Sequence, residues 1–363
     1  MSLVLKKAIL DVKLYVPGRP ITEVKRELGL EEVIKLASNE NPYPPPPKVL
    51  QAIQRAAREL NRYPDGNCYY LREQLAKNLK VNPKQLIFGN GSDEVIILAV
   101  RGFVNEGDEV IMAAPSFLVY EIASKIAGAV IKAIPLREDF SYDLSCMRAS
   151  VSEKTKVIFL GNPDNPSGKY FTQKQMEGLL EGLPSSVLVL IDEAYYEYVG
   201  ARDYVNSIEL LKKYKNILIT RTFSKMYGLA GLRIGYGLGD EEIISYLNRL
   251  REPFNVNSLA QAAALACLKD QAYYQKLLKE INEERAFLYQ SFKKLQLEYV
   301  ESCTNFILVK IKTKEASVVS QALLKKGIIV RDMSVWGLKN YIRITIGTKK
   351  ENKKLITALE EIV

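Results

Sequence analysis

Between residues 85 and 239 the sequence repeats one pattern, in which a short apolar run is followed by a polar stretch long enough for a helix. Apolar runs with helix-length connections are typical of a mainly parallel sheet that helices cover on both faces. We expect strands at 85–90, 108–115, 129–136, 156–163, 187–195, 216–223 and 233–239. The pattern therefore predicts an α/β fold, and ligands are expected at the polar ends of its strands.

The pattern changes after about residue 254. A long helical stretch over 258–295 precedes three further strand candidates at 306–311, 327–333 and 341–347. This order predicts a smaller α+β unit, closed by a helix near the C-terminus. We expect a large domain over 41–254, a small C-terminal domain over 255–363, and an N-terminal segment, 1–40, that packs with the small domain or across the site.

The composition argues against several kinds of active site and partner. The chain has no histidine and four widely spaced cysteines, which argues against a Ser-His-Asp triad, a disulfide framework and a metal site. Its net charge of +9 comes from dispersed Lys and Arg residues, which suits anionic small molecules better than nucleic acid. No apolar run approaches the roughly 18 residues of a membrane span, and the N-terminus lacks an apolar signal core. We therefore expect a cytoplasmic protein that binds neither membrane nor nucleic acid.

A single lysine, Lys225, stands just beyond the apolar run 216–219. Loss of hydration at the end of a buried strand favours the neutral amine, which can attack a carbonyl and form a Schiff base. A solvated loop lysine is the simpler alternative when Lys225 is considered alone. Ser224 and Arg233 flank it with a hydroxyl and a guanidinium, and both groups suit a phosphate.

Four other strand ends carry polar or aromatic residues. Asp192 ends an apolar strand and needs a partner such as a protonated pyridine nitrogen, although a helix N-cap would also explain it. Glycines before Ser92 and Asp93 open a helix N-terminus that could bind phosphate, unless the acidic residues are only caps. Asn165 lies in a tight turn, and Phe117 follows a strand where its ring could stack on a planar ligand. Together these groups are what a phosphorylated pyridine aldehyde requires.

The motifs occur in a characteristic order between about residues 15 and 348. They read YVPGRP, KLASNENP, NRYPDG, GNGSDE, NPDNPSG, IDEAYYEY, FSKMYGLAGLRIGY and VRDMSVWGLKNYIRITIGT. With them the chain resembles the fold-type I pyridoxal-phosphate (PLP) aminotransferases of class I/II, and within that family the histidinol-phosphate aminotransferases. The resemblance implies the PLP-dependent transferase fold type I, with a large domain whose mainly parallel sheet lies between helices and a smaller α+β domain.

The resemblance also implies how the cofactor is held. Lys225 would bind PLP covalently and move the substrate proton, and Asp192 would pair with the pyridinium nitrogen. Tyr195 would donate to the phenolic oxygen together with Asn165, while Phe117 would stack on the ring, where relatives often have tyrosine. Phosphate contacts would come from the backbone around Ser92 and Asp93, from Thr222, Ser224 and Arg233, and from Tyr63. Because Tyr63 would reach in from a neighbouring subunit, a homodimer with shared active sites is implied.

Substrate recognition is implied in the same way. Arg343 would be the main anion-binding arginine and Arg331 the second, while Tyr15 and Asn39 would help to close the site. The implied reaction is transamination of L-histidinol phosphate with 2-oxoglutarate, which gives imidazole-acetol phosphate and glutamate in histidine biosynthesis. The partners are therefore a small-molecule amino donor and a keto-acid acceptor. A further departure from relatives is the proline run of NPYPPPP, where they tend to have a glycine.

Other functions remain open at this point. Broad-specificity aromatic aminotransferases and threonine-phosphate decarboxylases share the catalytic core. A regulator with an aminotransferase-like sensor would need a DNA-binding module, for which the roughly 40 residues ahead of the core are too few. An inactive scaffold is disfavoured because Lys225, Asp192, Tyr195 and Arg233 are all intact.

Overall fold

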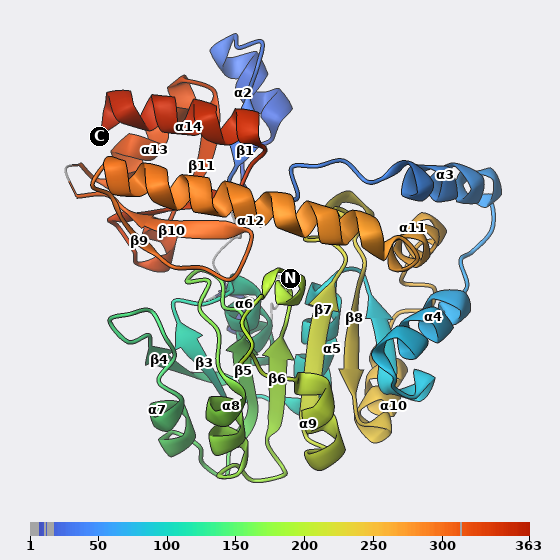
Figure 1. The fold of residues 1–363 in the computed structure, drawn as a ribbon. Coiled ribbons are helices and arrows are strands. Elements are labelled where there is room, and N and C mark those ends of the chain that lie inside the picture. Colours follow the sequence, from blue (N-terminus) through green and yellow to red (C-terminus); the bar gives the residue numbers. More distant parts are fainter. Residues whose placement is uncertain (1–6, 11, 13–17, 313) are drawn as a thin grey trace, which may run out of the picture.

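The computed structural model describes residues 7–10, 12, 18–312 and 314–363, and contains a large and a small sheet (Figure 1). The large sheet has seven strands in the order β2-β8-β7-β6-β5-β3-β4. They are β2 (Leu86–Gly89), β3 (Glu109–Ala114), β4 (Val130–Pro135), β5 (Thr155–Gly161), β6 (Leu188–Asp192), β7 (Ile217–Thr222) and β8 (Gly235–Gly239). All seven expected strands are present. Strand β8 runs antiparallel to both of its neighbours, β2 and β7, and the other strand pairs are parallel. The predicted α/β class is confirmed.

Helices cover both faces of the large sheet because its central strands are apolar on both sides. In β6, Val189 and Ile191 belong to one buried cluster, whereas Leu188 and Leu190 belong to the other. The first cluster takes side chains from α7 (Leu144–Ala149), α8 (Gln173–Leu180) and α9 (Ser207–Lys213). The second takes them from α5 (Ser92–Phe103), α6 (Leu118–Ala127) and α10 (Glu241–Leu250). The polar strand ends are thereby left at the edge of a buried sheet.

The small sheet combines the two ends of the chain. Its five strands follow the order β1-β11-β12-β10-β9. They are β1 (Ile34–Leu36), β9 (Glu298–Val300), β10 (Phe306–Lys310), β11 (Ile328–Asp332) and β12 (Tyr341–Thr345). The three expected C-terminal strands are present as β10, β11 and β12. We did not predict β1, which pairs parallel with β11, or β9, which pairs antiparallel with β10. The N-terminal segment thus contributes a strand to the small sheet.

The remaining helices join and cover the two sheets. The helical stretch expected over 258–295 forms two helices, α11 (Ser258–Leu268) and α12 (Gln271–Lys294). Helix α11 packs against α3 (Pro47–Ala56) and α4 (Tyr69–Leu79), while α12 reaches from there to the small sheet (Figure 1). The others are α1 (Lys7–Leu10), α2 (Ile21–Leu28), α13 (Ala316–Lys325) and α14 (Lys349–Ile362). The domain limits at residues 40 and 254 stay a prediction.

No helix among the described residues combines the length and the apolar character that crossing a bilayer would require.

A buried ion pair joins Arg221 of β7 to Glu193, the residue that follows β6. The Arg221 guanidinium donates to the Glu193 carboxylate from Nε at 2.8 Å and pairs with it through Nη2 at 2.7 Å. The ring of Tyr196 lies 3.7 Å from the guanidinium carbon, and the Ser207 hydroxyl donates to the same carboxylate. Both charged side chains are almost wholly buried, so neither can exchange its partner for water.

We expect Glu193→Gln to lower the free energy of unfolding by about 3 kcal/mol, because it leaves the buried Arg221 without a counter-charge. The matched control is Glu209→Gln, which removes one partner of an exposed ion pair with Lys212 and should cost less than about 1 kcal/mol. Urea unfolding followed by circular dichroism measures both. Equal, small losses in the two variants would contradict a structural role for the buried pair.

Candidate active site

A cavity of about 390 Å³ lies at the carboxyl edge of the large sheet, where residues of both sheets line it. Its lining includes most of the residues predicted from the sequence. These are Asn39, Ser92, Asp93, Phe117, Asn165, Asp192, Tyr195, Thr222, Ser224, Lys225, Arg233, Arg331 and Arg343. Two predicted residues are not among them: Tyr63 lies elsewhere, and Tyr15 lies outside the described residues.

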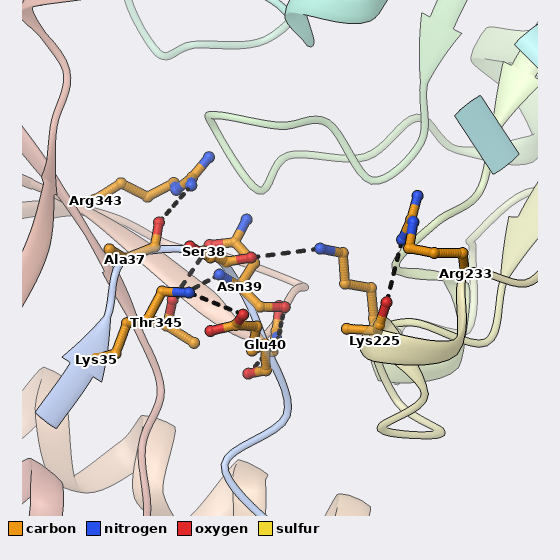
Figure 2. A network of polar contacts seen from close by, with 11 residues as sticks. Lys35, Ala37, Ser38, Asn39, Glu40, Lys225, Arg233, Arg343 and Thr345 are labelled. Atoms are coloured by element: carbon orange, nitrogen blue, oxygen red, sulfur yellow. Dashed lines mark hydrogen bonds and ion pairs between the residues drawn. The ribbon is translucent and has the colours of Figure 1, made fainter. Parts of the chain in front are cut away.

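Lys225 is presented by the turn that follows β7. The turn closes through hydrogen bonds from Leu229 N to Phe223 O and from Gly228 N to Lys225 O. The Lys225 amine lies 3.5 Å from the carbonyl oxygen of Ser38 (Figure 2) and 5.7 Å from the centre of the Tyr195 ring. Burial, and next the positive charge of Arg343, lowers the pKa of Lys225 to about 8. A useful fraction of the amine is therefore neutral and nucleophilic near neutral pH.

Asp192 ends β6 as a buried carboxylate with two hydroxyl partners. The Tyr120 hydroxyl donates to Oδ2 at 2.7 Å, and the Thr220 hydroxyl donates to Oδ1 at 3.0 Å. Burial raises the pKa of Asp192 to about 6, while these hydrogen bonds oppose the rise. The group is thus mostly ionised at neutral pH, and it suits a protonated ring nitrogen that would replace part of its lost hydration.

The N-terminus of α5 is a candidate anion site. Its N-cap is Gly91, and no described side chain caps the backbone N–H groups there. The Arg233 guanidinium lies beside this terminus, with Nη2 3.3 Å from Asp93 Oδ2. A Cβ on Gly91, whose φ is +78°, would approach Arg233 Nη2 to 2.6 Å, and one on Gly235 would approach the Ser92 nitrogen to 2.4 Å. Glycines therefore keep open a terminus that, with its dipole and the guanidinium, fits a phosphate.

A second candidate anion site lies on the small sheet. Arg331 of β11 and Arg343 of β12 stand directly opposite each other in the antiparallel register. Arg343 donates to the Asn165 side-chain oxygen at 2.5 Å and to Ala37 O at 3.0 Å, and the Arg331 guanidinium lies 4.8 Å from the Trp336 ring centre. Like charges opposite each other on neighbouring strands repel, so this arrangement favours a bound anion.

The segment 37–40 crosses the cavity between Lys225 and Arg343 (Figure 2). Asn39, with a left-handed φ of 54°, donates from its backbone to Thr345 Oγ1 and from its side chain to the Tyr195 hydroxyl, both at 2.9 Å. Burial raises the pKa of Tyr195 to about 12, so its hydroxyl keeps its proton. Because that oxygen already accepts from Asn39, its hydrogen is available to donate into the cavity.

Tyr63 is 82% exposed and stacks on Phe254, with ring centres 4.8 Å apart. Its predicted role in the site of a neighbouring subunit stays a prediction. The structure adds two residues that sequence reasoning missed. Tyr120 lies three residues after Phe117, but its pairing with Asp192 depends on how α6 packs. Trp336 lies inside a matched motif, and only the fold places its ring at the cavity.

Together, the described residues fit PLP by their chemistry. They supply an amine, a carboxylate for a ring nitrogen, an uncapped helix terminus for a phosphate, and the Phe117 ring for a planar heterocycle. The described residues hold no cluster of three or more His, Cys, Asp or Glu side chains that could bind a metal ion.

Comparison with known proteins agrees with this chemistry. The family of class I and II aminotransferases matches residues 31–359. Histidinol-phosphate aminotransferase of Moorella thermoacetica is 48% identical over 99% of this chain and 92% of its own length. That of Bacillus subtilis is 44% identical over 99% of both chains.

Solved structures lead to the same family. Histidinol-phosphate aminotransferase from Sinorhizobium meliloti in complex with pyridoxal-5'-phosphate superposes with a TM-score of 0.91 at 30% identity, over 98% of this chain and 96% of that one. Aspartate aminotransferase from Thermus thermophilus with maleate, at 21% identity, has a TM-score of 0.85 over 99% and 98%, and shares the fold. The chain therefore belongs to the class I and II aminotransferases and, within them, to the PLP-dependent histidinol-phosphate aminotransferases.

Proposed function

We propose that the chain transfers the amino group of L-histidinol phosphate to 2-oxoglutarate, giving imidazole-acetol phosphate and glutamate in histidine biosynthesis. The observation that carries this proposal is the pair of separate anion sites in one cavity. The N-terminus of α5 with Arg233 suits the cofactor phosphate, which leaves the opposed Arg331 and Arg343 for an anion on the substrate.

The two arginines suit both substrates in turn. Histidinol phosphate carries a phosphate and no carboxylate, whereas glutamate carries two carboxylates. Guanidinium groups bind either anion through paired N–H donors, so one pocket can hold both molecules. Asn165 accepts from Arg343 and would keep that guanidinium directed into the cavity.

The residues around the amine have distinct proposed roles. Bound PLP supplies the carbonyl group and the electron-withdrawing ring that transamination requires. Lys225 would attach to that carbonyl and later carry a proton between the substrate carbon and the cofactor. Asp192 would hold the ring nitrogen in its protonated form, while Tyr195 and Asn165 would bond to the phenolic oxygen. Phe117 would stack on the ring, and Ser92, Thr222 and Ser224 would help to bind the phosphate.

The enzyme acts on small molecules, and we propose that it works in the cytoplasm as a homodimer with shared sites, without nucleic acid or membrane. Supporting the dimer, the exposed rings of Tyr63 and Phe254 stack on each other at the surface, and contiguous exposed apolar patches are typical of interaction sites. Tyr63 lies outside the cavity of its own chain and would bind the cofactor phosphate of the partner. The N-terminal segment would pack with the small domain through β1 and would line the site through residues 37–40.

An aromatic aminotransferase is the second candidate, because the aromatic rings of Phe117 and Trp336 line the cavity.

Adding L-histidinol phosphate to the PLP-loaded enzyme without keto acid should convert the cofactor to its amino form in a single turnover. L-phenylalanine should react much more slowly, since its α-carboxylate is its only anion, whereas histidinol phosphate presents a phosphate and glutamate two carboxylates to the two arginines. Absorbance in a stopped-flow instrument measures both reactions. A faster reaction with phenylalanine would instead assign the enzyme to the aromatic aminotransferases.

Lys225→Ala should abolish turnover and the protein–cofactor adduct that borohydride traps, because no other amine is expected to replace it. Lys215→Ala is the matched control, since its amine is exposed and pairs with Asp240 far from the cavity. Steady-state assay and mass spectrometry of the reduced protein are the measurements. Wild-type activity in the Lys225 variant would contradict covalent attachment at this residue.

Capture of PLP by the cofactor-free enzyme should accelerate with rising pH and level off above about 8, because only the neutral Lys225 amine reacts. Arg343→Gln removes a positive charge that lowers this pKa, so the midpoint should move to higher pH. The rate of adduct formation, followed by absorbance across the pH range, measures the shift. An unchanged midpoint would show that Arg343 does not tune the amine.

A further inference from the structure

Trp336 stands between the active-site cavity and a second cavity. It ends a short 3₁₀ helix, η5 (Ser334–Trp336), that follows β11, and it is the only tryptophan in the chain. The second cavity has a volume of about 520 Å³ and is mostly apolar, with Met112, Ala113 and Ile131 in its lining. Trp336, Phe117 and Leu118 line both cavities.

Two contacts fix the Trp336 ring in this position. Its Nε1 donates to the carbonyl oxygen of Ser116 at 3.2 Å, which ties the small sheet to the loop after β3. The Arg331 guanidinium lies over the ring, 4.8 Å from its centre. An indole that is anchored on one side and stacked with a cation on the other can both close a cavity and orient the cation.

The position of the Trp336 ring limits the size of the substrate that the active-site cavity can hold. The active-site cavity of about 390 Å³ must hold the cofactor as well as the substrate, so little volume remains for a substrate side chain. Removing the indole would join this space to the second cavity and give room for a larger ring. It would also take away the surface on which Arg331 rests.

We propose that Trp336 determines substrate specificity. Its ring closes the pocket against larger aromatic side chains and holds Arg331 toward the anion of the substrate. This inference rests on the proposed function, because it assigns the selected substrate an anionic end and a small ring. Trp336 is expected to act on substrate choice and not on the chemistry at Lys225.

The test uses Trp336→Ala and Trp336→Phe, with Val335→Ala as the matched control. Val335 is 68% exposed and lines the second cavity but not the active site. The PLP-loaded enzymes are mixed separately with L-histidinol phosphate, L-glutamate and L-phenylalanine, and kcat/KM is measured for each. The ratios between substrates in one variant cancel any common loss of stability or of cofactor.

In Trp336→Ala we expect kcat/KM for histidinol phosphate and glutamate to fall about tenfold, mainly through KM, as loss of one cation–π contact and its alignment predicts. The value for phenylalanine should hold or rise, since it has no distal anion and gains room. Trp336→Phe keeps a ring for Arg331 but loses the bond to Ser116, so the same shift should be smaller. Val335→Ala should leave every ratio unchanged.

The same tryptophan gives a readout that does not require turnover. Because Trp336 is the only tryptophan, the indole fluorescence of the PLP-loaded wild-type enzyme reports on this position alone. Titration with 2-oxoglutarate, which cannot react with that form, should change the emission as the anion reaches Arg331. An unchanged emission at saturating ligand would overturn the proposed contact.

The outcomes separate the two proposals. Unchanged substrate ratios in Trp336→Ala, or an equal fall for all three substrates, would overturn the specificity role and leave the proposed function intact. A wild-type enzyme that does not react with histidinol phosphate would overturn the proposed function, and the ratio of glutamate to phenylalanine would then decide the role of Trp336. If Trp336→Ala does not fold, the ratios of Trp336→Phe decide it.

Discussion

The parallel register of β5, β6 and β7 is the constraint on which the site depends. It places Gly161, Asp192 and Thr220 side by side at the carboxyl edge of the sheet. Thr220 can therefore donate to Asp192, and a side chain at Gly161 would meet the Tyr142 hydroxyl and Asp164. A shift of one residue in β6 would turn Asp192 away from the cavity, because neighbouring residues of a strand face opposite sides of a sheet.

The cavity brings groups of both charges together. Asp192 is buried and accepts from two hydroxyl groups, whereas Arg233, Arg331 and Arg343 line the same cavity from three different segments. Burial is the main cause of the lowered pKa of Lys225, and the positive charge of Arg343 adds to it. Arg343 thus contributes both to the lowered pKa of the lysine and to the positive charge of the cavity.

The sequence predicted what is local. Apolar runs marked every strand of the large sheet, and the residues just beyond them indicated Lys225, Asp192 and Asn165 as site residues. The contacts of Tyr120 and Trp336 could not be predicted from the sequence, because they depend on how α6 and η5 pack against distant strands. Strand β1 was missed because three residues at the edge of a sheet carry little periodic signal. The predicted contact of Tyr63 lies in a neighbouring subunit, and no pattern within one chain specifies how two subunits pack.

The pairing of β1 with β11 joins residues 34–36 to residues 328–330. Strand β1 is therefore synthesised early but can pair only after β11 has been made. During synthesis the large sheet can form while β1 still lacks its partner, because domains fold as they emerge from the ribosome. Residues 37–40, which follow β1 and cross the cavity, are held by Thr345, Asn305 and Arg343. The site is therefore completed only after nearly all of the chain has been translated, and a truncated nascent chain could not assemble it.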